Sequence, residues 1–558
     1  MKGSREVPLW LAPLMVAMFI AAYALVMTYS TPFGLPPDER AHWSYIMDAM
    51  ESERFLPDYL DGDIRGADRK NYLVHPPLYY TVGGLVGMVT GASVDEDFRV
   101  FRILSVLFFG GGLFLILWAA ARRGVSVPAL ALLGLGTGAV PMFAYLAGSI
   151  NNDGLAYLAV GMVFLAFALA REDRDTWVPH AWLLFGGLTI AFLTKMNAAA
   201  FLSFLVAAMI LLRFRDLPAM FRRWDLWVAG TAFVIVVGGY YLWIRAHAGG
   251  FFPRPEALYT AITLQDPMSF RDYAKEFFGS MWRRLPVAMS HMSVGPYPDA
   301  LVRVFFAAVF FPPLTWAVLR VVTPWRTQQR ARVVLADAVM LALLASLTLH
   351  FLVAYRGYLE TGLLGALQPR YYIYMIPLLW VPAFLVMREG WIQTMATVLF
   401  GILVLASFWG SVTFFQQKQY EGLLEMRPPT AFAGVESKEK REASLLMRGE
   451  IRGHVDNLRL ENGSLFVRGW AFDSDRTERP LRIVVLGRGV FMGAGVVDNL
   501  RTDVARALGT PRARNAGFAL RIWEIPQDIG PCDLSVLAEF PDGSFSEIPV
   551  ANCEEPPY

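Results

Sequence analysis

The chain has 558 residues, of which 55% are hydrophobic and only 18% are charged, and its formal net charge is +2. Soluble domains carry roughly 25% charged residues, so this composition argues against a soluble enzyme. The near-neutral charge, without a basic stripe interleaved with aromatic residues, argues against a nucleic-acid partner. Apolar stretches of about 20 residues recur along the first three-quarters of the chain, which is the length of a helix that crosses a ~30 Å hydrocarbon core. The sequence therefore predicts a polytopic α-helical membrane protein.

The first apolar run extends from Pro8 to Met27 and follows two basic residues, Lys2 and Arg5. A cleaved signal peptide is the alternative to a membrane span, because the Ala-Tyr-Ala sequence at Ala22–Ala24 resembles a cleavage site. Cleavage there would fall inside an apolar run that is long for a signal peptide. We therefore expect an uncleaved first span.

Basic clusters between the apolar segments predict the topology, because short loops rich in Lys and Arg stay in the cytoplasm. The apolar segments lie near residues 8–29, 76–92, 99–121, 127–149, 153–170, 180–194, 196–213, 225–246, 300–322, 333–355, 371–388 and 391–415. The basic clusters lie near residues 2–5, 122–123, 171–174, 213–223, 320–332 and 388. These clusters share one side of the membrane only if one apolar segment does not cross.

Segment 76–92, PPLYYTVGGLVGMVTGA, is the weakest span, since it is short, rich in Gly and opened by a pair of Pro residues. We expect it to lie at the outer interface, which leaves about eleven spans, a cytoplasmic N-terminus and an extracytoplasmic C-terminus. The outer loops are then 31–98 and 247–299, and the expected location is the bacterial inner membrane. Four basic residues of the loop 247–299 oppose this topology: Arg254, Arg271, Arg283 and Arg284.

The composition changes after the membrane domain, 1–415. Residues 416–450 are charged and contain Pro, which indicates a linker. Residues 451–558 show alternation with period two between turn sequences, and this pattern predicts an extracytoplasmic all-β sandwich. This region contains the aromatic residues Trp470, Phe472 and Trp523. They either stack on carbohydrate or pack in the core, and both interpretations remain open.

The chain has two cysteines, Cys532 and Cys553, both in the region placed outside. An oxidising compartment would permit a disulfide between them, and two unrelated thiols are the alternative.

Residues 36–45, PPDERAHWSY, place two carboxylates directly after the first span. Pro36 and the period of the following residues predict a helix on which Asp38, His42 and Tyr45 form one stripe. Its apolar face, expected to lie on the membrane, holds Trp43, Ile46, Met47 and Met50. Asp38 and Glu39 either cap this helix or serve a site. Glu39 leans toward the apolar side, where an unpaired carboxylate would be costly.

Three more polar motifs fall on the outer side. They are HPPLYY at residues 75–80, SINND at 149–153 and QPRYY at 368–372. Each motif alone is explained by the satisfaction of helix ends. Together they place carboxylates, an Arg and several Tyr on one side of the membrane, which favours a site.

These motifs, in this order, resemble the GT-C superfamily of integral-membrane glycosyltransferases over roughly residues 8–400. The similarity is greatest to a bacterial family of predicted membrane proteins with an Asp-Glu-x-x-His motif. It is more distant to protein O-mannosyltransferases and to lipid A aminoarabinose transferases. The resemblance implies juxtamembrane helices in the first outer loop and a polyprenyl-phosphate-linked sugar as donor. His75 is a departure, since the aminoarabinose transferases tend to have Lys at that position.

The resemblance also implies an inverting transfer with Asp38 as the general base. His42, one turn further on, would orient Asp38, and Glu39 would bind the acceptor or tune the pKa of the base. Arg370 is the first candidate for the donor phosphate, because a guanidinium binds such oxygens bidentately, and Lys195 is the second. Further candidates for donor or substrate binding are Tyr371, His75, Tyr79, Asn152 and Gln368.

Asp153 is a candidate for supporting the acceptor site or a divalent cation, and no other cofactor is expected. Each of these residues has a structural alternative: Arg370 as an anchor of a helix end, Lys195 as an interfacial side chain and Asp153 as a helix cap.

The expected partners are membrane lipids, the lipid-linked donor and a glycan, lipid or protein acceptor in the cell envelope. A nucleotide-sugar donor is disfavoured, since the sequence has no Asp-x-Asp metal motif or Gly-rich phosphate loop. The competing hypothesis is a transporter or flippase of lipid-linked saccharides, which would place ionisable residues near mid-span and break its helices.

Overall fold

The computed structural model describes most of the chain in two compact units, a first built from residues 1–290 and 297–415 and a second built chiefly from residues 416–558. The described residues are 8–31, 33, 36, 38–51, 56, 75–92, 98–173, 176–251, 268–284, 299–322, 330–361, 369–387, 394–409, 451–461, 464–473, 480, 482–497, 501–510, 512–513, 516–522, 528–540 and 544–550. The expected linker therefore lies outside the described residues.

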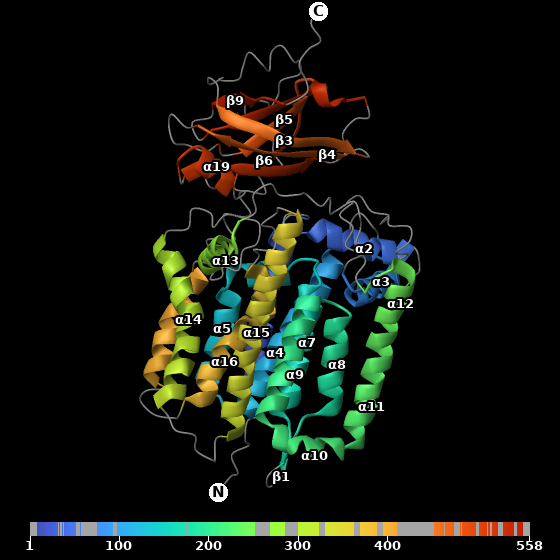
Figure 1. Cartoon of the computed structure of the whole chain (residues 1–558), viewed down its shortest axis with the longest axis vertical. Helices are drawn as coiled ribbons and strands as arrows, with labels where there is room; N and C mark the ends of the chain where they lie inside the picture. The colour runs from blue at the N-terminus through green and yellow to red at the C-terminus, as the bar shows by residue number, and fades with distance from the viewer. Residues whose placement is uncertain are drawn as a thin grey trace, which may run out of the picture. The chain divides into compact units, whose positions relative to one another are not determined.

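The first unit is helical (Figure 1). Its first helices are α1 (Leu11–Ser30), α2 (Glu39–Glu51), α3 (Leu78–Thr90), α4 (Phe98–Arg122), α5 (Val127–Ala139), α6 (Pro141–Ala147), α7 (Asp153–Ala168), α8 (Ala181–Phe192) and α9 (Met196–Leu212). A short hairpin, β1 (Arg171–Asp173) and β2 (Thr176–Val178), joins α7 to α8. Then follow the 3-10 helix η1 (Phe214–Asp216), α10 (Leu217–Phe221), α11 (Trp224–Phe233), the π-helix η2 (Val234–Gly238), α12 (Gly239–Ala248), α13 (Phe270–Arg284), α14 (Asp299–Val322), α15 (Arg330–Thr361), the 3-10 helix η6 (Pro369–Met375), α16 (Ile376–Val386) and the helix Thr394–Trp409.

Within the described residues, four helices are long and apolar enough to cross a membrane: Leu11–Tyr29, Phe98–Arg122, Trp224–His247 and Arg332–Leu359. The pair Met196–Leu212 and Phe214–Phe221 passes the same test together, with a bend of 80° between them. Shorter apolar helices occupy the other expected spans. The chain is thus a membrane protein, and the expected number of about eleven spans stays a prediction.

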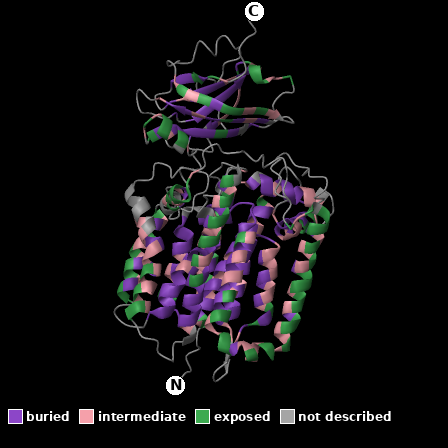
Figure 2. Ribbon diagram, in the orientation of Figure 1, coloured by how far each residue is buried: buried purple, intermediate pink, exposed green. Residues whose placement is uncertain are grey.

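Burial varies across the helical unit as expected for helices in lipid (Figure 2). Almost every residue of α7 is buried, so α7 lies at the centre of the unit. In contrast, α11 and η2 expose large apolar side chains such as Trp224, Val234 and Ile235. Such a surface is costly in water and suits contact with hydrocarbon.

Helix α2 packs on α3 rather than on the membrane, which corrects the expectation for its apolar face. Ile46 and Met47 are buried, and a Cβ on Gly83 of α3 would lie 2.8 Å from the Cδ1 atom of Ile46. Three glycines of α3 therefore permit the close contact: Gly83, Gly84 and Gly87. In Figure 1, α2 and α3 lie at the upper end of the helical unit, and α10 and β1 at the lower end.

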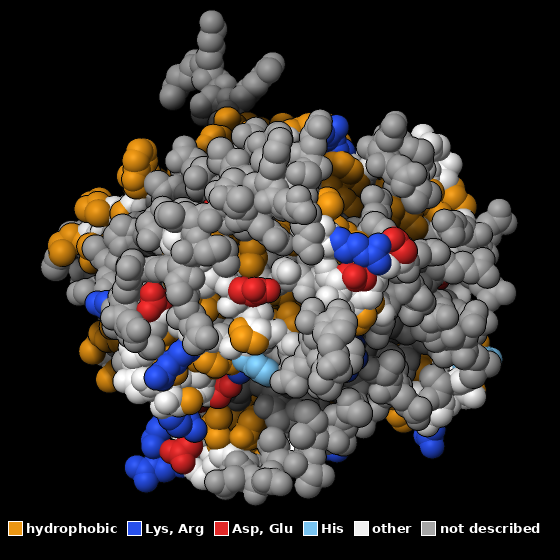
Figure 3. All heavy atoms as spheres, turned by 90° about the horizontal axis from the view of Figure 1, so that it is seen from above, with side chains coloured by type: hydrophobic (Ala, Val, Ile, Leu, Met, Phe, Trp, Pro, Cys, Tyr) orange, Lys and Arg blue, Asp and Glu red, His pale blue; other side chains and the backbone are white. Residues whose placement is uncertain are grey.

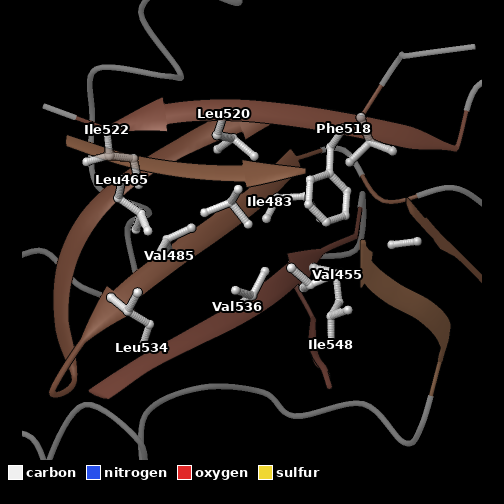
Figure 4. Packing of buried hydrophobic residues seen from close by; sticks show 14 of the residues in the cluster. Val455, Leu465, Ile483, Val485, Phe518, Leu520, Ile522, Leu534, Val536 and Ile548 are labelled. Carbon is white, nitrogen blue, oxygen red and sulfur yellow. The ribbon is translucent and has the colours of Figure 1, made fainter. Parts of the chain in front are cut away.

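The second unit contains two antiparallel sheets with the strand orders β3-β4-β7 and β6-β5-β8-β9. The strands are β3 (Arg452–Glu461), β4 (Ser464–Phe472), β5 (Arg482–Gly487), β6 (Val490–Val496), β7 (Gly517–Ile522), β8 (Leu534–Glu539) and β9 (Phe545–Ile548). Alternate residues from both sheets, including Val467, Ile483 and Phe518, form one hydrophobic core (Figure 4). A β-rich C-terminal region is thus confirmed, with one short helix, α19 (Thr502–Ala507), added to it.

The aromatic residues proposed for carbohydrate stacking divide between core and surface. Phe472 is completely buried beside Val504, which excludes it from stacking on a sugar, and Trp470 is half-buried against the same cluster. Trp523 lies outside the described residues. Cys532 is disulfide-bonded. The other cysteine of the sequence, Cys553, lies outside the described residues.

Charged side chains of the second unit form local ion pairs. Arg501 contacts Asp456 at 2.6 Å and Asp503 at 2.7 Å, and Arg488 contacts Asp528 at 2.7 Å. Figure 3 shows basic and acidic side chains interspersed with hydrophobic ones on the face that it presents. In each of these pairs the arginine charge is neutralised by a neighbouring aspartate.

The contact between α4 and α7 depends on glycine and yields a stability prediction. A Cβ on Gly112 would lie 2.7 Å from the carbonyl oxygen of Tyr157, and backbone atoms cannot move aside as a side chain can. We expect Gly112→Ala to lower the melting temperature of the purified protein, since overpacking costs ~1–3 kcal/mol. Gly111→Ala is the control, because its nearest contact is the Cδ1 atom of Leu158 at 3.3 Å. Equal melting temperatures for the two variants would contradict this packing.

Candidate functional site

Polar side chains from segments far apart in the sequence meet at the end of the helical unit where α2 and α3 lie. They come from the start of α2, the turn before α3, the helix α4, the α6–α7 turn, the α8–α9 turn and η6. The expected outer motifs are thus close in space, although the loops between them are long. Two buried ion pairs organise the cluster.

Asp38 occupies an unusual backbone position directly before α2. Its φ angle is +62°, in the left-handed region that only a few per cent of non-glycine residues adopt. The Asp38 carbonyl accepts the His42 N–H at 3.1 Å, so the residue forms the first turn of the helix. Its side chain is half-buried. Residues held in sparsely populated conformations cost about 1–3 kcal/mol and cluster at functional sites, which supports a role for Asp38 beyond capping.

Glu39 is completely buried and forms a bidentate ion pair with Arg102 of α4, which is also completely buried. Nε and Nη2 of Arg102 each donate to one carboxylate oxygen at 2.7 Å. The backbone N–H of Ile150 donates to the Oε1 atom of Glu39 at 3.0 Å. Nη1 of Arg102 donates to the carbonyl oxygens of Thr28 and Thr31 at 2.9 Å and 2.7 Å.

This clamp joins the end of α1, the start of α2, the helix α4 and the α6–α7 turn. The expectation that a carboxylate at position 39 needs a partner is thereby met, and the partner is Arg102. Because both Glu39 oxygens are engaged with Arg102, its role in binding the acceptor stays a prediction that the geometry does not favour.

His42 and Tyr80 link α2 to α3. The Nδ1 atom of His42 lies 2.8 Å from the Tyr80 hydroxyl, and the two rings stack. The Tyr45 ring stacks on Tyr80 with centroids 3.8 Å apart, so His42 and Tyr45 share one side of α2 as expected. The ring centroid of His75 lies 6.1 Å from that of His42. Tyr79 points elsewhere, since its hydroxyl lies 2.9 Å from the Ser105 hydroxyl on α4.

A second buried ion pair joins Asp153 at the start of α7 to Lys195 before α9, with 2.5 Å between Oδ1 and Nζ. Asn152 connects this pair to the preceding group. Its Nδ2 atom lies 3.4 Å from the Nδ1 atom of His75 and donates to the Thr194 carbonyl at 3.1 Å. His75, Asn152, Lys195 and Asp153 therefore form a continuous polar network.

Two structural alternatives for this network are wrong. Lys195 is 7% exposed and ion-paired, so it does not extend toward the interface as a free cation. Asp153 is not the N-cap residue of α7, because that position is occupied by Asn152 and Asp153 is the first residue of the helix.

Of the QPRYY motif, the structure describes the ring of Tyr371 but neither Gln368 nor the side chain of Arg370. The Lys195 Nζ atom lies 6.0 Å from the centroid of the Tyr371 ring, a cation–π distance. On the other side, the Nδ1 atom of His350 in α15 lies 2.6 Å from the Tyr372 hydroxyl. The start of η6 thus joins the network to α15, and the role of Arg370 stays a prediction.

An apolar cavity of about 420 Å³ lies beside the network. Its walls come from the start of α3, the end of α8 and the segment around η2; they are Leu56, Pro77, Leu78, Thr81, Leu193, Val236, Gly239, Tyr240 and Trp243. Leu193 and Pro77 are each two residues from a polar group of the network, Lys195 and His75 respectively. The π-helix that contributes Val236 is a type of distortion that is frequent at functional sites.

Across the described part of the chain, no group of three or more His, Cys, Asp or Glu side chains is placed to hold a metal ion. The expectation of a divalent cation at Asp153 stays untested, and Lys195 occupies one of its carboxylate oxygens.

Comparisons with known proteins give one weak likeness. No family model matches the chain, and no curated protein matches it. Among solved structures, the chain is similar to ArnT from Cupriavidus metallidurans bound to undecaprenyl phosphate, with a TM-score of 0.33 and 18% identity over 66% of this chain and 76% of that chain. A likeness this low assigns neither a fold nor a function to the chain.

The clamp predicts a double-mutant pattern in stability. Glu39→Gln leaves the Arg102 charge buried and unpaired, which costs ~3–5 kcal/mol, so we expect a clear fall in melting temperature. Adding Arg102→Met removes that charge, and the double variant should be less destabilised than the sum of the two single variants. Thermal unfolding of the purified proteins measures this coupling. Strict additivity would show that the pair is not formed.

Proposed function

We propose that the chain is a membrane glycosyltransferase of GT-C type that moves a sugar from a polyprenyl-phosphate donor to an acceptor of the cell envelope. The carrying observation is the apolar cavity whose wall residues Leu193 and Pro77 are each two residues from Lys195 and His75 in the sequence. An apolar cavity next to cationic and polar groups matches an amphipathic ligand with an anionic head. The motif resemblance to GT-C enzymes supports the same donor class.

The donor would place its isoprenoid chain in the cavity and its phosphate at the polar network. Lys195, two residues from the wall residue Leu193, would contact the phosphate, with His75 and Asn152 as further hydrogen-bonding groups. Arg370, whose backbone lies in η6, is the further candidate for this phosphate. Lys195 already forms an ion pair with Asp153. A bound donor phosphate would therefore have to contact Lys195 together with the Asp153 carboxylate.

In the transfer step, Asp38 would accept the proton of the acceptor hydroxyl while that oxygen attacks the anomeric carbon. The bond between the anomeric carbon and the phosphate oxygen breaks, and the phosphate leaves with the electron pair. Attack opposite the leaving group inverts the anomeric configuration. The clamp of Glu39 and Arg102 fixes the turn that carries Asp38, and His42 lies one helical turn further on.

We place this site on the extracytoplasmic side of the bacterial inner membrane, with the N-terminus in the cytoplasm and the C-terminal β domain outside. The β domain would recruit the acceptor or cover the site.

A transporter of lipid-linked saccharides is the alternative, and the bent pair Met196–Leu212 and Phe214–Phe221 is the observation nearest to it. That bend lies at the end of α9 remote from Lys195, away from the polar network.

The Asp38 assignment predicts a loss of transfer without a loss of folding. Purified protein would be incubated with a panel of radiolabelled polyprenyl-phosphate sugars and an envelope extract. General acid–base catalysis contributes roughly 10²–10⁴-fold, so Asp38→Asn should lower transfer by that factor. Asp48→Asn is the matched control, because it makes the same Asp-to-Asn change within α2, the helix that Asp38 precedes. Equal activity of the two variants would remove Asp38 from the chemistry, and movement of the lipid-linked sugar across vesicles without transfer would favour the transporter.

The cavity predicts a selective loss of lipid binding. A Cβ on Gly239 meets no atom within 4 Å, and Gly239 lines the cavity, so Gly239→Leu should fill it without disturbing the helix. We expect weaker binding of undecaprenyl phosphate, measured with the purified protein, at an unchanged melting temperature. Gly238→Leu is the matched control, since Gly238 has equal space but does not line the cavity. Equal affinities would show that the lipid chain lies elsewhere.

A further inference from the structure

The Tyr374 hydroxyl is buried at a cost that packing does not explain. Tyr374 is 0% exposed, and its hydroxyl has no hydrogen-bond partner among the described residues. Leaving a buried hydroxyl unpaired is unfavourable, whereas Phe would fill nearly the same volume without that cost. A buried polar group without a partner needs an explanation, and a bound ligand group is one that the position of Tyr374 supports.

Tyr374 faces the network rather than the lipid. It lies in the 3-10 helix η6, where residues i and i+3 eclipse, so Tyr374 and Tyr371 share one face. The Tyr371 ring contacts Lys195, and η6 packs on α7, which begins at Asp153. The Asp153 carboxylate also acts electrostatically on the Tyr374 phenol.

Asp153 has capacity to accept another hydrogen bond. Lys195 occupies its Oδ1 atom, and its carboxylate makes no other hydrogen bond within the described part of the chain. The nearby Thr194 hydroxyl is also buried without a partner there. A carboxylate that accepts, beside a phenol that both donates and accepts, matches a neutral hydroxyl group.

We propose that Tyr374 is a specificity-determining residue that hydrogen-bonds a hydroxyl group of the transferred sugar, while that same hydroxyl donates a hydrogen bond to the Asp153 carboxylate. This inference rests on the proposed function and adds the place of the sugar to it. The phosphate lies at Lys195, and the sugar is turned toward η6 and the start of α7. A site built to pair a substrate hydroxyl rejects analogues that lack it, because its own polar groups are then left unpaired.

Tyr157 is a matched control in the same chain. It is also completely buried with an unpaired hydroxyl, and it lies one helical turn after Asp153 on α7. Its ring, however, packs against Phe109 and Phe143, with centroids 5.3 Å and 5.5 Å away. It therefore faces α4 and α6 instead of η6.

The test compares binding of two kinds of lipid to the full-length purified protein in nanodiscs. The probes are undecaprenyl phosphate alone and undecaprenyl phosphate that carries glucose, galactose, mannose or 4-amino-4-deoxyarabinose. We expect the wild type to bind one sugar-bearing lipid more tightly than the bare lipid. Tyr374→Phe should reduce that preference by about five- to tenfold, as expected for one lost hydrogen bond, and leave the bare lipid unaffected. Its melting temperature should not fall.

Tyr157→Phe should keep the full preference. An unchanged preference in Tyr374→Phe, or an equal loss in Tyr157→Phe, would overturn the inference and show a hydroxyl buried without a substrate role. If the wild type binds the bare lipid but prefers no sugar-bearing form, the hydroxyl subsite is wrong while the phosphate site stands. If the wild type binds neither kind of lipid, the proposed function itself fails.

Discussion

The arrangement of the candidate site depends on the buried ion pair between Glu39 and Arg102. A pair of charges removed from water is tolerated only when nearly every hydrogen-bonding group finds a partner. Here the guanidinium satisfies two carbonyl oxygens at the end of α1 in addition to the carboxylate, which also accepts from Ile150. The pair therefore fixes the first outer turn against α4 and the α6–α7 turn. The two adjacent acids divide their tasks: Glu39 holds the turn, and Asp38 sits on it with a strained backbone.

The second pair, Asp153 and Lys195, has a different character. Lys195 of this pair is two residues from Leu193 in the wall of the apolar cavity. The Tyr374 hydroxyl, on the same side of η6 as the Tyr371 ring that contacts Lys195, has no hydrogen-bond partner among the described residues. In the Glu39–Arg102 pair, by contrast, each carboxylate oxygen and each guanidinium nitrogen is engaged with a partner. This contrast between neighbouring ion pairs separates the scaffold from the proposed donor site.

The sequence predicted the helical membrane domain and the β-rich C-terminal region because both follow from residue periodicity. It also predicted that the outer motifs converge, and Asp38, His42, His75, Asn152, Asp153 and Lys195 do lie in one region. Arg102 was missed, although a charge inside the apolar run of α4 was a signal that a partner exists. The sequence could not identify Tyr374 as a candidate site residue, because the lack of a partner for its hydroxyl depends on tertiary packing. The packing of α2 on α3 likewise depends on contacts between two segments that periodicity does not relate.

A cryo-electron microscopy structure of the protein in nanodiscs with undecaprenyl phosphate tests the account most directly. We predict density for the isoprenoid chain between α3, α8 and η2, and density for the phosphate within hydrogen-bond distance of the Lys195 Nζ atom. Such a structure would also show whether Lys195 remains paired with Asp153. Lipid density elsewhere on the helical unit, with the cavity and Lys195 unchanged, would contradict the proposed donor site.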